Sequence, residues 1–171
     1  MNFFLDRWSS PDFSFLLVTD QEGALRALEF GGGEERMRRL LHTYYGNFSL
    51  EEGTAPDEIR QALAAYFNGR IDALAEVPVA SGGTAFQREV WRALRAIPAG
   101  TTMSYGQLAT NLGRAGASRA VGAANGANPI AIVVPCHRVI GANGALTGYG
   151  SGLPYKRWLL DHESRFASGH L

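Results

Sequence analysis

The single cysteine of this chain, Cys136, stands in a sequence that favours nucleophilic chemistry. It follows the apolar run 130–134 and Pro135, and it is followed directly by His137 and Arg138. An imidazole can accept the proton of a thiol, and nearby positive charge lowers the pKa of a thiol. Most lone cysteines are small buried apolar residues, and the residue alone leaves that alternative open. Its neighbours make Cys136 a candidate nucleophile.

Composition excludes several classes of protein. The 171 residues are 46% hydrophobic and 19% charged, which is typical of a globular chain of one compact domain or two small ones. No stretch resembles a signal peptide or a membrane span. One cysteine cannot form an intramolecular disulfide, and the four scattered histidines lack the spacing of metal ligands. We therefore expect a cytoplasmic protein with no membrane association, no metal and no cofactor.

The charge is distributed unevenly along the chain. Residues 1–83 hold seven arginines against thirteen acidic residues, a net charge of −6. Residues 84–171 hold nine basic residues against three acidic ones, a net charge of +6. Such an excess of basic residues suggests that the second half faces a polyanion. A chance split between solvated helix faces is the alternative.

The first half predicts an α+β domain over residues 1–83. Turn-forming residues 20–23 separate two strand-like runs, and residues 72–83, which end in Ser81-Gly82-Gly83, form the predicted linker. Helix-start and helix-stop residues bound two further segments. The predicted strands are 13–18 and 24–30, and the predicted helices are 34–45 and about 54–68.

The second half, residues 84–171, is rich in helix-start signals. Thr84 with Gln87, and Ser104 with Gln107, have the form of capping boxes. The first opens a helix with apolar residues at helical spacing, and the second opens a short helix. A third helical segment covers 118–126, so the short pair has the form of a helix-turn-helix. The remaining signals are Pro98 and Gly113 as helix ends and Pro154 as the start of a last helix reaching Arg165.

The segment 118–126 has an unusual composition for a core helix. Apart from Arg119, Val121 and Asn125 it consists of Ser, Ala and Gly. Small side chains permit close approach, either to another helix or to a DNA groove with Arg119 projecting. Both interpretations fit this segment equally well.

Three motifs together resemble one known family. These are Asn128-Pro129, the run Pro135-Cys136-His137-Arg138-Val139, and Gly148-Tyr149-Gly150. They resemble the O6-alkylguanine-DNA alkyltransferases, the methylated-DNA–protein-cysteine methyltransferases, over about residues 84–164. The resemblance implies a ribonuclease-H-like α/β domain over 1–83 and a winged-helix-like, helix-turn-helix DNA-binding domain over 84–171 that carries the cysteine. It corresponds to the bacterial single-polypeptide type without a zinc-binding regulatory module.

The resemblance also implies a reaction and its catalytic residues. An alkyl group would pass irreversibly from O6-alkylguanine to Cys136 after the damaged nucleotide is flipped out of duplex DNA, with O4-alkylthymine as a second candidate lesion. His137 would act as a base through a bridging water, and Glu163 would orient it. Tyr105 would donate a proton to guanine, and Asn128 would order the hydrogen-bond network.

Further residues match the family's DNA- and substrate-binding positions. Arg119 would fill the space that the flipped base leaves, with its helix in the minor groove. Residues 148–151 would form one wall of the alkylguanine pocket, and Lys156 would lie near its rim. We expect a monomer, with several molecules able to bind along one DNA. The implied binding residues are Ser118, Arg119, Ala120, Gly122, Ala123, Asn125, Gly126, Pro135, Arg138, Val139, Tyr149, Gly150, Ser151 and Lys156.

Three other functions are alternatives to repair. A non-catalytic lesion-binding relative typically lacks the acceptor cysteine. An alkylation-sensing regulator adds a cysteine-rich zinc module, whereas residues 1–83 hold no cysteine. A cysteine hydrolase would use the same Cys–His pair but needs an oxyanion hole. Because a thioether is a poor leaving group, the resemblance implies one transfer per molecule, with destabilisation of the alkylated protein as a hypothesis.

Overall fold

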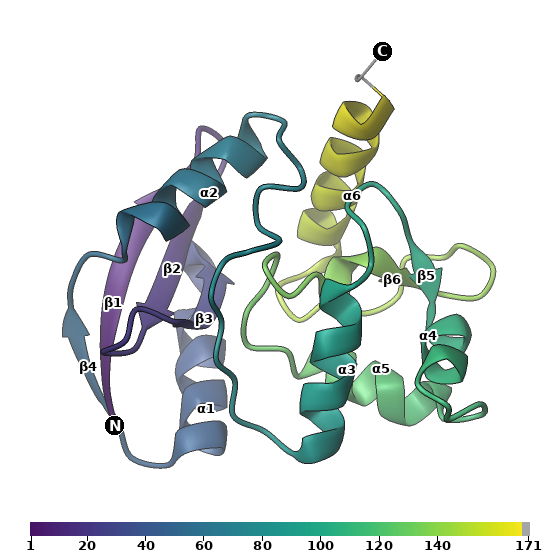
Figure 1. The fold of residues 1–171 in the computed structure, drawn as a ribbon, viewed down its shortest axis with the longest axis horizontal. Helices are drawn as coiled ribbons and strands as arrows, with labels where there is room; N and C mark the ends of the chain where they lie inside the picture. The colour runs from purple at the N-terminus through teal and green to yellow at the C-terminus, as the bar shows by residue number, and fades with distance from the viewer. Residues whose placement is uncertain (169–171) are drawn as a thin grey trace. The chain divides into compact units, whose positions relative to one another are not determined.

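A computed structural model describes residues 1–168 and divides the chain into two compact units (Figure 1). The first unit comprises 1–83 together with 129–133, and the second comprises 84–128 together with the chain from 134 onward. Strands and helices occur in both, which confirms the predicted α+β class. None of the described helices is long and apolar enough to cross a membrane.

A four-stranded sheet forms the centre of the first unit. Its strands stand in the order β3-β2-β1-β4. β1 pairs antiparallel with β2 and parallel with β4, and β2 pairs antiparallel with β3. The bounds are β1 (Asn2–Ser9), β2 (Ser14–Thr19), β3 (Leu25–Phe30) and β4 (Ser49–Glu52).

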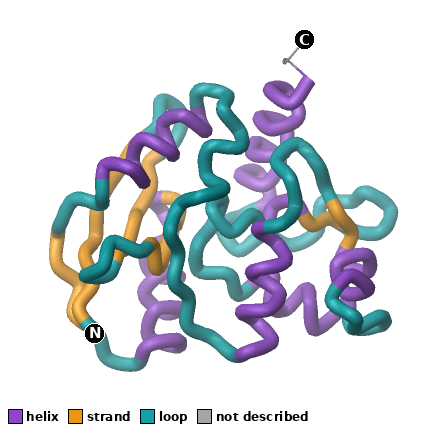
Figure 2. The backbone as a smooth tube through the Cα atoms, viewed as in Figure 1, coloured by secondary structure: helices purple, strands orange, loops and turns teal. Residues whose placement is uncertain are grey.

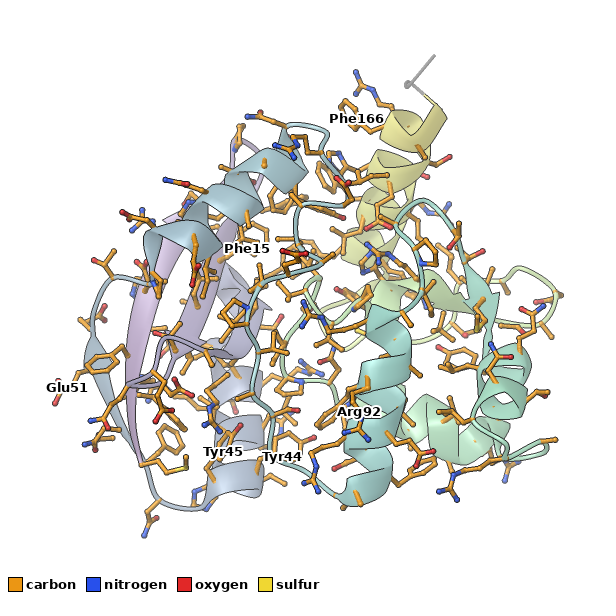
Figure 3. All side chains as sticks on the ribbon, viewed as in Figure 1. Phe15, Tyr44, Tyr45, Glu51, Arg92 and Phe166 are labelled. Atoms are coloured by element: carbon orange, nitrogen blue, oxygen red, sulfur yellow. The ribbon has the colours of Figure 1, made fainter. Side chains whose placement is uncertain are left out.

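Helices pack on this sheet because its strands carry apolar side chains on both faces. Leu16 and Val18 of β2 join one buried cluster with Met37 and Leu41 of α1 (Glu34–Tyr45). The alternate residue Phe15 (labelled in Figure 3) points to the other face, where its ring lies 5.3 Å from that of Phe67. Phe67 ends α2 (Asp57–Phe67). A strand covered on both faces loses the polar alternation of a surface strand, so β2 is buried almost throughout.

The sequence reading missed two strands of this sheet. β4 is short and mostly exposed, and β1 carries Asp6 and Arg7 in its middle. Asp6 is tolerated there because its carboxylate accepts hydrogen bonds from the backbone of Ala55 at 2.9 Å and from Arg60 at 3.2 Å. These partners lie about fifty residues away in sequence, and so the local pattern gives no sign of them.

The segment 129–133 belongs to the first unit although it directly precedes the cysteine motif. Ile130 forms a parallel bridge with Leu28 of β3. Ile132 has a φ of 70°, and the N–H of Val133 donates to the carbonyl of Ala131 at 2.7 Å. The turn is therefore a γ-turn with positive φ, the rarer and more strained of the two forms, and its central residue Ile132 is buried and β-branched. The backbone therefore changes direction sharply just before the nucleophile.

The second unit consists of four helices and a two-stranded parallel sheet, within the described residues. Both predicted capping boxes are confirmed, at Thr84–Gln87 and at Ser104–Gln107. Figure 2 shows the long loop that leads from β6 into α6. The elements are α3 (Ala85–Arg95), β5 (Met103–Ser104), α4 (Tyr105–Asn111), α5 (Ser118–Gly126), a 3-10 turn η2 (Cys136–Arg138), β6 (Val139–Ile140) and α6 (Leu153–Ser168).

Candidate active site

Cys136 opens the 3-10 turn η2 and is only 6% exposed. The residue before it, Pro135, has φ −83° and ψ 65°, and the N–H of Cys136 donates to the carbonyl of Val134 at 2.8 Å. Pro135 thus occupies the centre of an inverse γ-turn. The thiol is therefore held on a tight turn with little of its surface exposed to solvent.

His137 and Glu163 form a buried pair beside the cysteine. His137 is 0% exposed, and its Nε2 lies 2.7 Å from Oε2 of Glu163 on α6, which is 1% exposed. The side chains come from elements 26 residues apart that pack against each other. The structure therefore brings together the predicted nucleophile, base and orienting carboxylate in one turn and one helix.

Electrostatics fixes the protonation state of this pair. Burial raises the pKa of Glu163, but His137 and Arg138 together outweigh that effect and hold it well below its ordinary value. Burial lowers the pKa of His137, with Arg138 and Lys156 acting in the same direction and Glu163 opposing them. At neutral pH the carboxylate is therefore ionised and the imidazole neutral.

The tautomer of His137 follows from these charges. An ionised carboxylate only accepts hydrogen bonds, so Nε2 must carry the hydrogen that it donates to Glu163. That leaves Nδ1 with a lone pair, and this atom has no hydrogen-bond partner among the described residues. Nδ1 is consequently the atom that can accept a proton.

Arg138, expected among the substrate- and DNA-binding residues, has its side chain directed into the protein. The residue is buried, and its Nε and Nη2 donate to the two oxygens of Glu163 at 2.9 and 3.0 Å. Its Nη1 donates to the carbonyl of Ile97 at 2.8 Å. The basic residue beside the nucleophile faces inward because a buried carboxylate needs a counter-charge.

Two asparagines hold the backbone around the nucleophile. The side-chain amide of Asn128 donates to the carbonyl of Val134 at 2.8 Å, as expected for an ordering residue. Asn125 of α5 donates in the same way to the carbonyl of Cys136 at 3.3 Å. Asn125 was expected to contact DNA, but it is buried and turned toward the cysteine. Its contact ties the helix α5 to the turn η2.

Tyr105 and Lys156 meet at the loop between β6 and α6. The hydroxyl of Tyr105 donates to the carbonyl of Thr147 at 3.1 Å. The ammonium of Lys156 donates to the same carbonyl at 2.9 Å, to that of Val139 at 2.7 Å and to that of Gly148 at 3.3 Å. Burial lowers the pKa of Lys156, while Cys136 acts electrostatically in the opposite direction. Lys156 is thus buried beneath the loop rather than placed at a rim.

The other residues that were predicted to line the alkylguanine pocket differ in their exposure to solvent. Pro135 and Val139 are buried, whereas Gly148, with a φ of 52°, and Gly150 are exposed. Tyr149 and Ser151 are half-buried. Sequence reasoning missed the part of Thr147, because its contribution is a backbone carbonyl, which has no sequence signature.

The solvent-exposed face of helix α5 carries small side chains and one long one, that of Arg119. Val121, Ala124 and Asn125 face inward, and the indole of Trp91 on α3 donates to the carbonyl of Ala124 at 2.8 Å. The outward residues are small apart from Arg119. The exposed predicted binding residues are Ser118, Arg119, Ala120, Ala123 and Gly126, and Gly122 is half-buried.

A cavity of about 370 Å³ lies against Glu163. Thr101, Leu160 and Ser164 are among its lining residues, and Cys136 is not. It is therefore not the pocket that a base would enter to reach the thiol. In the part of the chain that the structure describes, no group of three or more His, Cys, Asp or Glu residues could hold a metal ion.

Comparisons with known proteins agree with this geometry. Residues 85–165 match the family model described as the DNA-binding domain of 6-O-methylguanine DNA methyltransferase. A methylated-DNA–protein-cysteine methyltransferase of Salmonella typhimurium is 55% identical over 160 residues, covering 92% of this chain and 94% of the relative. One of Methanosarcina acetivorans is 46% identical over 156 residues, covering 91% and 95%. The crystal structure of Mycobacterium tuberculosis OGT in complex with DNA superposes with a TM-score of 0.77 at 40% identity, covering 95% of this chain and 94% of that one.

Proposed function

This chain belongs to the methylated-DNA–protein-cysteine methyltransferases, and we propose that it restores O6-alkylguanine in duplex DNA by moving the alkyl group, once and irreversibly, to Cys136. The observation that carries the proposal is the buried pair of His137 and Glu163, with Nε2 and Oε2 2.7 Å apart, in the turn that begins with the buried Cys136. It supplies a soft nucleophile, a neutral base and a carboxylate that orients the base.

The reaction is balanced by these groups without a redox step. The sulfur electron pair forms a bond to the alkyl carbon as the bond between that carbon and guanine O6 breaks. The thiol proton passes through a bridging water to Nδ1 of His137, and the departing guanine gains one proton, for which Tyr105 is the donor. Release of the proton from His137 to solvent and uptake of one by Tyr105 then return both side chains to their starting states. The products are a neutral thioether and an intact guanine, so the protein is consumed.

Tyr105 must change partner for this role. Its hydroxyl donates to the carbonyl of Thr147, which Lys156 also holds. When a base enters, the hydroxyl can turn to it while Lys156 continues to satisfy that carbonyl. The loop would then keep its position as Tyr105 becomes available to guanine.

Helix α5 is the proposed DNA-binding element. Its outward residues are small and would allow close approach to the minor groove, and Arg119 would occupy the place of the flipped nucleotide. The net charge of +6 over residues 84–171 supports binding of phosphates. We assign direct contacts to the exposed residues of α5 and to residues 148–151, and Asn125 and Arg138 act inside the protein.

The finer architecture belongs to the same proposal. Residues 1–83 would form a ribonuclease-H-like α/β domain, and residues 84–171 a winged-helix-like domain that binds DNA and accepts the alkyl group. The protein would act in the cytoplasm as a monomer, with several molecules able to bind along one DNA, and O4-alkylthymine is a second candidate substrate.

The fate of the lesion tests this function. The protein is mixed with a duplex containing one O6-methylguanine, and the DNA is digested and its nucleosides are quantified. We expect guanine to replace O6-methylguanine in a quantity equal to the protein added, with no further conversion. Conversion of many lesions per protein molecule would contradict a stoichiometric acceptor, and tight binding without conversion would indicate a lesion sensor.

A further inference from the structure

The guanidinium of Arg138 is held at three points in the second unit. Its Nε and Nη2 donate to Oε1 and Oε2 of Glu163 at 2.9 and 3.0 Å, and its Nη1 donates to the carbonyl of Ile97 at 2.8 Å. A two-pronged contact of this kind fixes the plane of the carboxylate as well as its position. The oxygen Oε2 is the one that also accepts the hydrogen bond from His137 at 2.7 Å. Arg138 and His137 thus share one carboxylate.

Resting on the function proposed above, we propose that Arg138 is a positioning residue of alkyl transfer: it holds Glu163 in the orientation and charge state that make Nδ1 of His137 the base. This assignment replaces the expected contact between Arg138 and DNA. Arg138 acts through Glu163 and His137, and it does not touch the reacting atoms.

The need for this residue follows from what Glu163 would do without it. Arg138 supplies one hydrogen bond to each oxygen of this carboxylate, at 2.9 and 3.0 Å. A buried carboxylate that loses both of these charged donors would rotate or draw a proton onto His137. A protonated imidazole has no lone pair left to accept the thiol proton.

The charges around His137 are few and can be named. Glu163 and Lys156 act on it from α6, and Arg138 acts from its own turn, with Cys136 as its neighbour. α3 also packs against this turn, and its buried residues are Val90, Trp91 and Leu94, which carry no charge. Glu163 favours the protonated imidazole, and Arg138 and Lys156 favour the neutral one. Removal of the Arg138 charge therefore raises the pKa of His137.

Two substitutions separate the effect of the Arg138 charge from the effect of its hydrogen-bond geometry. Arg138→Met removes both the charge and the fork of donors while keeping an unbranched apolar stem. Arg138→Lys keeps the charge but cannot hold both carboxylate oxygens with two parallel hydrogen bonds. Arg60→Met is the matched control, since it removes an arginine–carboxylate contact, to Asp6, in the first unit.

The experiment measures single-turnover transfer from a duplex with one O6-methylguanine, as a function of DNA concentration and of pH. Rates are normalised to the fraction of protein that becomes alkylated at the end point. We expect Arg138→Met to lower the saturating rate by about 10- to 100-fold. The DNA concentration at half-saturation stays unchanged, because the Arg138 side chain is buried and bonded inside the protein.

The pH profile gives the readout that a purely structural role would not move. In Arg138→Met the acidic limb of the saturating rate shifts to higher pH. In Arg138→Lys the limb stays where it is in the unsubstituted protein, but the rate remains below that of the unsubstituted protein. Arg60→Met leaves both quantities unchanged.

Two results would overturn the inference. A higher half-saturating DNA concentration at an unchanged saturating rate would make Arg138 a DNA contact. An acidic limb that stays in place in both variants would reduce Arg138 to structural support. If Arg138→Met does not fold, Arg138→Lys decides, because a rate equal to that of the unsubstituted protein contradicts the role. Failure of the unsubstituted protein to transfer the alkyl group would refute the proposed function instead.

Discussion

Two regions of the second unit, the turn η2 with its partner helix α6 and the outward face of α5, are built in opposite ways. The first buries an imidazole, a carboxylate and a guanidinium and joins them by hydrogen bonds of 2.7 to 3.0 Å. The second exposes small side chains and one arginine. Chemistry needs fixed charges shielded from water, whereas docking on DNA needs a surface that can approach closely. Substitutions in η2 and α6 should therefore lower the rate of alkyl transfer itself, whereas substitutions on the outward face of α5 should weaken the use of DNA.

The largest effect is expected at the nucleophile. Cys136→Ala leaves no atom to receive the alkyl group, so transfer should be abolished while binding to lesion-containing duplex persists. Intact-protein mass after incubation with O6-methylguanine duplex checks the first part, and fluorescence anisotropy of labelled duplex checks the second. Residual transfer in this variant would place the acceptor elsewhere.

Glu163→Gln should reduce transfer by about 10²- to 10³-fold, within the range that a general base contributes. An amide can donate to His137 as well as accept, so Nδ1 is no longer fixed as the basic atom. The variant also leaves Arg138 buried without its counter-ion, and we expect a loss of about 3–5 kcal/mol in the free energy of unfolding. Rapid-quench rates and urea denaturation measure the two effects. A rate close to that of the unsubstituted protein would remove Glu163 from the mechanism.

Arg119→Ala should affect DNA but not the chemistry. We expect transfer from lesion-containing duplex to slow by about 10-fold, from the loss of about one charged contact. Transfer from the free base O6-methylguanine should be unchanged, because the buried residues of η2 and α6 are intact. Parallel rate measurements on the two substrates test this. Equal losses on both would mean that Arg119 supports the site itself.

Stability should fall as the pH is lowered from neutral. The pKa of His137 lies below its ordinary value of 6.5 in the folded protein, so the unfolded chain binds the proton first. The depressed pKa of Glu163 adds a second loss below its ordinary value of 4.5. Each group contributes at most about 1.4 kcal/mol per pH unit. Urea denaturation at several pH values measures the trend, which His137→Gln should weaken between these two values. Equal stability at pH 6.5 and 4.5 would contradict the assigned protonation states.

Alkylation itself should lower the stability of the protein. Cys136 is 6% exposed, so a methyl group on its sulfur must displace packed neighbours, at a cost of about 1–3 kcal/mol. Comparison of melting temperatures before and after complete reaction measures this. Equal melting temperatures would show that the pocket accommodates the thioether without strain.

The helix positions in this chain could be predicted from the sequence because they depend on local signals. The capping boxes at Thr84 and Ser104 satisfy the first amides of their helices within three residues, and both appear as predicted. The strand β1 was missed because Asp6 is compensated by Ala55 and Arg60, which no local pattern reveals.

Prediction of the candidate active site from the sequence is limited in the same way, because some contacts join residues far apart in the chain. The family resemblance pointed to Cys136, His137 and Glu163, and the structure joins the last two. It placed Arg138 and Asn125 among the substrate- and DNA-binding residues, whereas the structure buries both side chains. Whether Arg138 meets a phosphate or a carboxylate depends on Glu163, 25 residues further along the chain. Such a pairing follows only from the fold.

The most direct test of the account is peptide mass spectrometry of the protein after reaction with duplex DNA that carries one O6-methylguanine. We predict the mass increase of one methyl group replacing a hydrogen, confined to the peptide that contains Cys136 and saturating at one per molecule. Modification of any other residue, or no mass change despite complete loss of O6-methylguanine from the DNA, would contradict Cys136 as the acceptor.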